Sequence, residues 1–87
     1  MEIRTSKEFN TTVAKLCKKN KHFGQKINNI LRILANFPNH PSLRLHKLRS
    51  TEYTSWSISV NTKTRILFVY KKYGILLVKI GSHDQVY

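Results

Sequence analysis

The hydrophobic pattern of the chain changes from a helical period to a strand period around its two prolines, Pro38 and Pro41. Both prolines lack a backbone N–H donor and restrict the residue before them, so a helix cannot continue through this segment. Apolar residues recur every three or four positions before it, and after it they either alternate with polar residues or form short β-prone runs. The sequence therefore predicts helices first and most of the strands last, which is an α+β arrangement.

Two amphipathic helices are predicted before the prolines. Ser6 is a suitable N-cap for a helix that opens at Lys7 and ends before Asn20. Its apolar face consists of Phe9, Val13, Leu16 and Cys17. A second helix is expected over residues 24–36, and its apolar stripe consists of Ile27, Ile30, Leu31, Leu34 and Phe37. Because Cys17 is the single cysteine and lies among apolar positions, we expect a buried structural thiol there.

Short strands are predicted at residues 2–5, around His46, and then at 55–60, 65–70 and 75–80, with turns at 50–54, 61–63 and 71–74. Three serines alternate with Trp56, Ile58 and Val60, a pattern that predicts a half-buried strand. We expect Trp56, Phe68 and Tyr70 to lie in the core. The expected fold is one domain spanning residues 1–87, in which an N-terminal helical hairpin packs on one face of a small, mainly antiparallel four- to five-stranded sheet.

The charge balance limits the chemistry that such a domain can perform. Sixteen Lys and Arg residues stand against four Asp and Glu, a net charge of +12, which favours a polyanionic partner such as nucleic acid. The four carboxylates, Glu2, Glu8, Glu52 and Asp84, are widely scattered, so a two-metal site or a carboxylate pair is not expected. Phosphate loops, dinucleotide-binding and zinc-protease motifs are also absent from the sequence, and we expect neither a metal nor a cofactor. With no long apolar run and no signal-peptide pattern, the chain is expected to be soluble and unexported.

The segment that follows the last predicted strand, residues 81–87, holds the most distinctive group of polar side chains. It reads Gly-Ser-His-Asp-Gln-Val-Tyr and contains His83, an acid and a terminal tyrosine. A rigid strand end can position such side chains for function. By itself the pattern is also typical of a solvated surface histidine.

The motifs together resemble a known family. A His46-Lys47-Leu48 run, a Trp-Ser-Ile-Ser-Val strand at residues 56–60, an Arg65-Ile66 pair and the closing segment 81–87 are similar to the RelE/ParE superfamily of type II toxins, over essentially the whole chain. The closing segment is most similar to the RelE, YoeB and YafQ branch. That resemblance implies the RelE-like fold and a cytoplasmic, ribosome-dependent, metal-independent endoribonuclease that cuts mRNA in the A site. It also implies mRNA, ribosomal RNA and an acidic antitoxin as partners.

The resemblance assigns roles to particular residues. RNA cleavage by its own 2′-OH needs a base, an acid and cations around the crowded phosphorus. His83 matches the C-terminal catalytic histidine, as general acid, and Arg65 matches the arginine that stabilises the phosphorane. His46 is the candidate general base, and Tyr87 matches the terminal aromatic that contacts the substrate. Three further basic residues are expected to hold phosphate or ribosomal RNA: Lys47, Arg49 and Lys63.

One departure from the family pattern leaves the identity of the general base undecided. Toxins similar to YafQ carry an additional histidine and aspartate on the middle strands, where this chain has Ser57 and Asn61. Neither residue is a base near neutral pH, so Lys47 and Glu52 stand as alternatives to His46. His22 and His40 are expected to be surface residues. The alternative functions are a gyrase inhibitor of the ParE kind without nuclease activity, and a catalytically inactive nucleic-acid-binding module.

Overall fold

A computed structural model describes residues 1–49 and 52–86, except for the side chain of His83. The elements follow in the order β1 (Glu2–Thr5), α1 (Lys7–Lys19), α2 (Phe23–Asn36), the 3-10 turn η1 (Pro41–Leu43), β2 (His46–Arg49), β3 (Thr54–Ser59), β4 (Thr64–Lys71), β5 (Gly74–Ser82) and α3 (His83–Val86). The predicted order of one strand, two helices and four strands is confirmed, and α3 is an addition to it. Within the described residues, no helix combines the length and the apolar character that a bilayer crossing requires.

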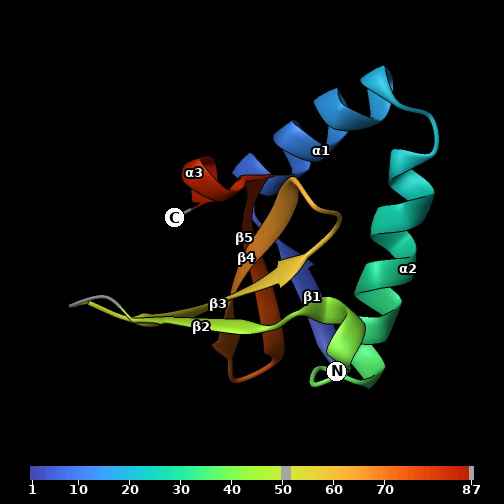
Figure 1. Ribbon diagram of the computed structural model, residues 1–87. Helices are drawn as coiled ribbons and strands as arrows, with labels where there is room; N and C mark the ends of the chain where they lie inside the picture. Colours follow the sequence, from blue (N-terminus) through green and yellow to red (C-terminus); the bar gives the residue numbers. More distant parts are fainter. Residues whose placement is uncertain (50–51, 87) are drawn as a thin grey trace.

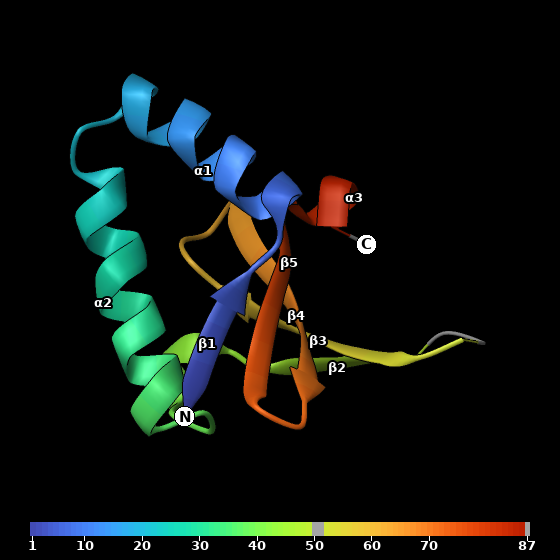
Figure 2. The ribbon, with the colours of Figure 1, turned by 180° about the vertical axis from the view of Figure 1, so that it is seen from behind.

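The strands form one five-stranded sheet in the order β1-β5-β4-β3-β2. Neighbouring strands from β2 to β5 pair antiparallel, whereas β1 pairs parallel with β5. In Figures 1 and 2, α1 crosses one end of the sheet and α2 runs along its side, β2 and β3 extend away from α2, and α3 lies on the side away from α2. The predicted α+β fold, with two helices on one face of a mainly antiparallel sheet, is confirmed.

The start of α1 is fastened to the sheet through Ser6. The Ser6 hydroxyl accepts a hydrogen bond from the Phe9 amide at 3.0 Å and donates one to the Val78 carbonyl at 2.7 Å. Val78 is the extra residue of a bulge in β5, because Phe68 pairs with Leu77 and Leu67 pairs with Lys79. The predicted N-cap is therefore confirmed, and it also satisfies a carbonyl at the irregular point of the strand.

The outer end of β1 is fixed at the β4–β5 turn. A Cβ on Gly74, whose φ is 145°, would lie 2.1 Å from the Glu2 carbonyl oxygen, so only glycine permits this approach of β1 to β5. The Arg4 guanidinium lies 3.9 Å from the centre of the Tyr73 ring and pairs with the Glu2 carboxylate. The hydrogen bond from Arg4 to the Glu2 carboxylate raises the pKa of Arg4, which stays charged.

The core lies between the helices and the sheet face that carries Ile58, Ile66 and Leu77, with Phe9, Ile27 and Leu34 from the helices. Cys17, expected to be buried, is half-buried and packs against this cluster.

Two side chains that were expected to be apolar core or stripe positions are exposed instead. Phe37, 64% exposed, is the C-cap of α2, and its backbone leaves the helical geometry there, so its side chain no longer follows the stripe. Tyr70, 45% exposed, lies near the end of β4 and contacts Trp56 and Phe68 edge-on. Of the three aromatic residues expected in the core, only Phe68 is fully buried, and Trp56 is half-buried.

The prediction that β3 is half-buried is wrong. Ser55 and Ser57, which the alternation places on the face opposite Ile58, are both buried, and Ser57 is fully so. Ser57 is covered by the side chain of Arg65, which lies across it from β4. The serine face of β3 is therefore part of a polar contact and not a solvated surface.

Candidate functional site

Two of the candidate residues, His46 and Arg65, lie on the sheet face opposite α1 and α2. His46 on β2 pairs with Ser57 on β3, and Ser59 on β3 pairs with Arg65 on β4. Cross-strand partners project from the same face, and so do residues two apart on one strand. His46, Ser57 and Arg65 therefore share one face, with Ser57 between the other two.

The guanidinium of Arg65 is held by neutral oxygen atoms. Its Nε donates to the Ser57 hydroxyl at 3.1 Å, and its Nη2 donates to the carbonyls of Arg44 at 2.7 Å and Ser57 at 3.2 Å. Toward the described residues, Nη1 donates no hydrogen bond. Because no carboxylate takes part in these contacts, they fix the direction of the guanidinium while leaving its positive charge uncompensated.

The Arg44 carbonyl reaches Arg65 because the chain bends sharply before β2. Arg44 has φ 48° and ψ 56°, the left-handed conformation, and it ends η1. His40 caps the start of η1, where its Nδ1 accepts from the Ser42 amide at 3.1 Å. His40 and His22 are both exposed, as predicted.

His46 begins β2 and is exposed. Cβ atoms of directly paired residues are about 4.5–5.5 Å apart, so the side chain of His46 leaves β2 next to that of Ser57, whose hydroxyl accepts from Arg65. This pairing brings the predicted base and the predicted phosphate-binding arginine to the same end of the sheet.

The backbone of His83 lies at the same end of the sheet. Gly81 and Ser82 in β5 pair with Arg65 and Thr64 in β4, and His83 follows directly as the first residue of α3. The side chain of His83 and the whole of Tyr87 lie outside the described part of the chain, so their predicted roles stay predictions.

The short α3 is fixed by a reciprocal cap at its start. The Ser82 amide donates to Gln85 Oε1 at 2.8 Å, and the Gln85 amide donates to the Ser82 hydroxyl at 3.4 Å. Val86 is buried at the other end. The Ser-x-x-Gln spacing is a capping-box pattern, which was the available sequence signal for this helix.

The three basic residues expected to hold RNA are divided between two places. Lys47 alternates with His46 and projects to the opposite face, where its Nζ lies 5.3 Å from the centre of the Trp56 ring. Arg49 lies two residues further on and shares the face of Lys47. Lys63 lies in the β3–β4 turn, two residues before Arg65, and its amide donates to Asn61 Oδ1 at 2.9 Å. Lys63 therefore lies close to Arg65 along the chain, whereas Lys47 and Arg49 project from the other face of the sheet.

Two groups that hold Arg65 were not predicted. Ser57 lay in the alternating serine pattern, but its role depends on the strand register, which the pattern does not contain. Arg44 has a left-handed backbone, but it is not one of the residue types, such as glycine or asparagine, that predict this conformation from sequence. Among the described side chains, no three of His, Cys, Asp or Glu come together as metal ligands.

The comparisons with known proteins concern the fold. By sequence, no family model and no curated protein matches the chain. By structure, the chain is similar to a metal-bound toxin from Helicobacter pylori, with TM-score 0.78 and 23% identity over 100% of this chain and 99% of that one. It is also similar to the E. coli DinJ-YafQ toxin-antitoxin complex, with TM-score 0.77 and 15% identity over 99% and 96% of the two chains. A third match is the YoeB-YefM complex from Staphylococcus aureus, with TM-score 0.70 and 20% identity over 95% and 97%.

These matches define the class of fold, since they span nearly the whole of each chain at low identity. The chain has the fold of the RelE/YoeB/YafQ-like toxins. The resemblance that the motifs indicated is thereby confirmed at the level of the fold.

Proposed function

We propose that the protein is the toxin of a type II toxin–antitoxin pair and that it cleaves mRNA in the ribosomal A site without a metal ion. The observation that carries this proposal is the guanidinium of Arg65, which is fixed by Ser57 and Arg44 through neutral oxygens. A cation held in this way is prepared for a phosphate, because its charge is unpaired and its Nη1 donors make no bond to the described residues.

Three groups divide the proposed reaction among them. His46 takes the proton from the 2′-OH, whose oxygen then bonds to the adjacent phosphorus. Arg65 stabilises the negative charge of the resulting phosphorane. The bond from phosphorus to the 5′ oxygen breaks, and His83 donates a proton to that oxygen. The products are a 2′,3′-cyclic phosphate and a 5′-OH.

The geometry favours His46 over Lys47 as the base. His46 shares the face of Arg65, whereas Lys47 lies on the other face against Trp56. Imidazole also has an unperturbed pKa of about 6.5, which suits proton transfer near neutral pH. Glu52, in the connection before β3, stays an alternative.

The exposure of the site supports dependence on the ribosome. His46 is exposed and Arg65 is only half-buried, so the chain by itself encloses little of an RNA strand. A ribosome that presents mRNA in a fixed conformation would supply the orientation that the protein lacks. We accordingly expect the protein to act in the cytoplasm, and an acidic antitoxin to neutralise it through its net charge of +12.

The test is cleavage of a reporter mRNA by purified protein in a translating extract. We expect His83→Ala and Arg65→Ala each to lower the cleavage rate about 100-fold or more. His22→Ala and Arg32→Ala are the matched controls, because both residues are exposed at or near α2, away from this face, and should leave the rate unchanged.

Two other outcomes separate the alternatives. Intact mRNA together with inhibited gyrase would identify a gyrase inhibitor of the ParE kind. Tight RNA binding without cleavage or gyrase inhibition would identify an inactive binding module. Product fragments should require a kinase before they can be ligated at their 5′ ends, and 5′-phosphate ends would contradict the proposed reaction.

A further inference from the structure

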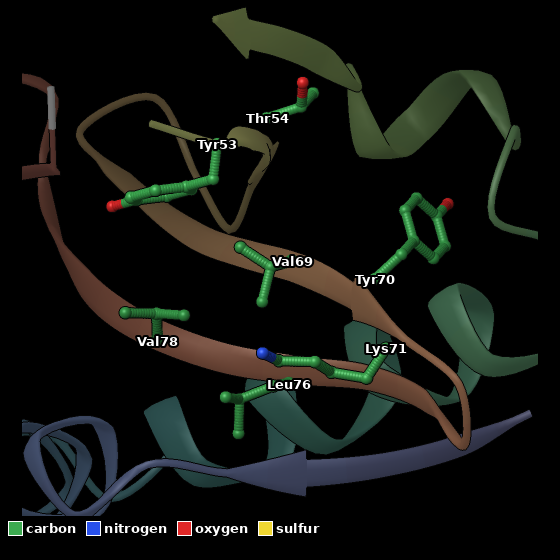
Figure 3. A pocket seen from close by; sticks show the side chains of 7 residues that line it. All are labelled: Tyr53, Thr54, Val69, Tyr70, Lys71, Leu76 and Val78. Carbon is green, nitrogen blue, oxygen red and sulfur yellow. The ribbon is translucent and has the colours of Figure 1, made fainter. Parts of the chain in front are cut away.

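The sheet face that carries Arg65 also contains an open groove toward the other end of β4 and β5. It has a volume of about 360 Å³ and is lined by Tyr53, Thr54, Val69, Tyr70, Lys71, Leu76 and Val78. Figure 3 shows that Val69, Leu76 and Val78 form its floor, and that the Tyr53 ring extends above this floor from the connection before β3. Lys71 stretches along the floor beside Leu76, whereas Tyr70 points away.

The chemistry of the lining selects a flat anionic ligand. Tyr53 is 56% exposed, and the three floor residues are half-buried aliphatic side chains. Among the described residues of the lining, Lys71 carries the charge and none is a carboxylate. An unstacked nucleobase fits such a site, because its faces can lie against an aromatic ring and aliphatic groups while its phosphate meets an ammonium.

The groove and the Arg65 site can be reached by one RNA strand. Val69 follows Arg65 on β4 by four residues, and both project from the same face, so their backbones are about 13 Å apart at the usual strand rise. Val69 pairs with Leu76, which places the groove beside the same two central strands. A single-stranded RNA whose scissile phosphate meets Arg65 therefore has flanking nucleotides within range of Tyr53.

We propose that this groove binds a nucleobase that flanks the cleavage position, with Tyr53 stacking on the base and Lys71 contacting its phosphate. The assignment rests on the proposed function and adds a second RNA subsite to it. A helix from a protein partner is a poorer occupant, because an amphipathic helix buries an apolar stripe several turns long, whereas the described residues of this floor supply three aliphatic side chains.

The test compares Tyr53 variants in the translating extract. Tyr53→Ala should lower kcat/KM for mRNA cleavage about 5- to 150-fold, the range expected for losing one base–aromatic stack. Tyr53→Phe keeps the ring and should stay within about twofold of the wild type. Tyr53→Leu keeps apolar bulk without a ring and should behave like Tyr53→Ala. Phe37→Ala is the matched control, because Phe37 is also an exposed aromatic residue and lies at the end of α2.

A binding experiment separates failure of this subsite from failure of the proposed nuclease. The probe is an uncleavable 2′-O-methyl RNA nonamer that contains one 5-iodouridine, which is crosslinked to the purified protein by ultraviolet light. Crosslinking to Tyr53 that Lys71→Gln weakens would support the subsite even if the wild type cleaved nothing. Active wild-type protein with unaffected Tyr53→Ala, or no crosslink at Tyr53, would overturn it. It would also be overturned if Tyr53→Ala weakened only the binding of an acidic protein partner.

Discussion

The side chain of Arg65 depends on a neighbour that is itself neither charged nor exposed. Ser57 is fully buried, and both its hydroxyl and its carbonyl accept hydrogen bonds from the guanidinium. A hydrogen bond to a charged group contributes about 1.5–3 kcal/mol, which is more than a neutral pair contributes. In the proposed reaction, Ser57 is therefore a positioning residue that acts through Arg65.

Removing the Ser57 hydroxyl should loosen Arg65 without removing its charge. We expect Ser57→Ala to lower kcat for mRNA cleavage about 10- to 100-fold with little change in KM, since the charge that attracts RNA stays in place. The same variant should broaden or shift the Nε–H resonance of Arg65 in an NMR spectrum. Ser55→Ala, a buried serine two residues earlier on the same face, is the control. Unchanged kcat and an unchanged Nε–H resonance would refute this role.

The residue types of the candidate site could be predicted from the sequence, but the groups that hold Arg65 in place could not. His46, Arg65 and His83 stand in recognisable patterns near strand ends. The contact between Ser57 and Arg65 depends on the register of two strands, and a shift of one residue would turn Ser57 to the opposite face. The Arg44 carbonyl reaches Arg65 from a residue in the left-handed backbone conformation. Because that residue is neither glycine nor asparagine, no local sequence pattern predicts the conformation.

At the scale of elements, local periodicity was sufficient for most of the fold. The helical period located α1 and α2, the period of two located β3, and continuous β-prone runs located β4 and β5. Pairing between distant segments was not predictable in this way. The parallel contact of β1 with β5 and the bulge at Val78 both arise where the start of α1 meets the sheet.

Ser6 joins these two irregular features, so its substitution should affect stability strongly for a side chain of its size. Ser6→Ala removes the acceptor for Phe9 and the donor for Val78, and we expect the free energy of unfolding to fall by about 1–3 kcal/mol. Ser6→Thr keeps both bonds and should be close to the wild type. Ser6→Asp keeps only the acceptor and should lie between them. Urea unfolding measures the series.

Thr11→Ala, at an exposed position inside α1, is the control for the Ser6 series and should be neutral or slightly stabilising. The role of Ser6 would be contradicted if Ser6→Ala unfolded at the same urea concentration as the wild type. If Ser6→Asp matched Ser6→Thr, the helix cap alone would explain the effect and the bond to Val78 would contribute nothing measurable.

At the scale of the whole molecule, the charge that suits an RNA partner opposes folding. Sixteen basic residues against four acidic ones are confined to a chain of 87 residues. Many of the lysines are exposed on α1, on the α1–α2 turn and at the β4–β5 turn, so they repel one another across the surface. Such self-repulsion destabilises a compact state, and salt screens it.

The same charge distribution should therefore make the Tm of the protein rise with salt and its binding of RNA weaken with salt. Between about 0.1 M and about 1 M sodium chloride the Debye length shortens from about 10 Å to about 3 Å, so repulsion within the folded protein weakens and its Tm should rise. A gain of about 1 kcal/mol corresponds to roughly 4–8 °C for a domain of this size. Binding of single-stranded RNA should weaken over the same range, because phosphate contacts release counterions that salt opposes.

A variant with fewer positive charges tests whether the salt dependences of the Tm and of RNA binding both arise from the net positive charge. Lys18, Lys21, Lys26 and Lys72 are exposed, and changing all four to Gln lowers the net charge without touching the sheet face of Arg65. Its Tm should depend less on salt than that of the wild type, because less repulsion remains to be screened. Its cleavage of ribosome-bound mRNA should persist if these lysines only attract polyanions. A Tm that falls with salt in the wild type, or an equal salt slope in both proteins, would show that self-repulsion does not limit the stability of this fold.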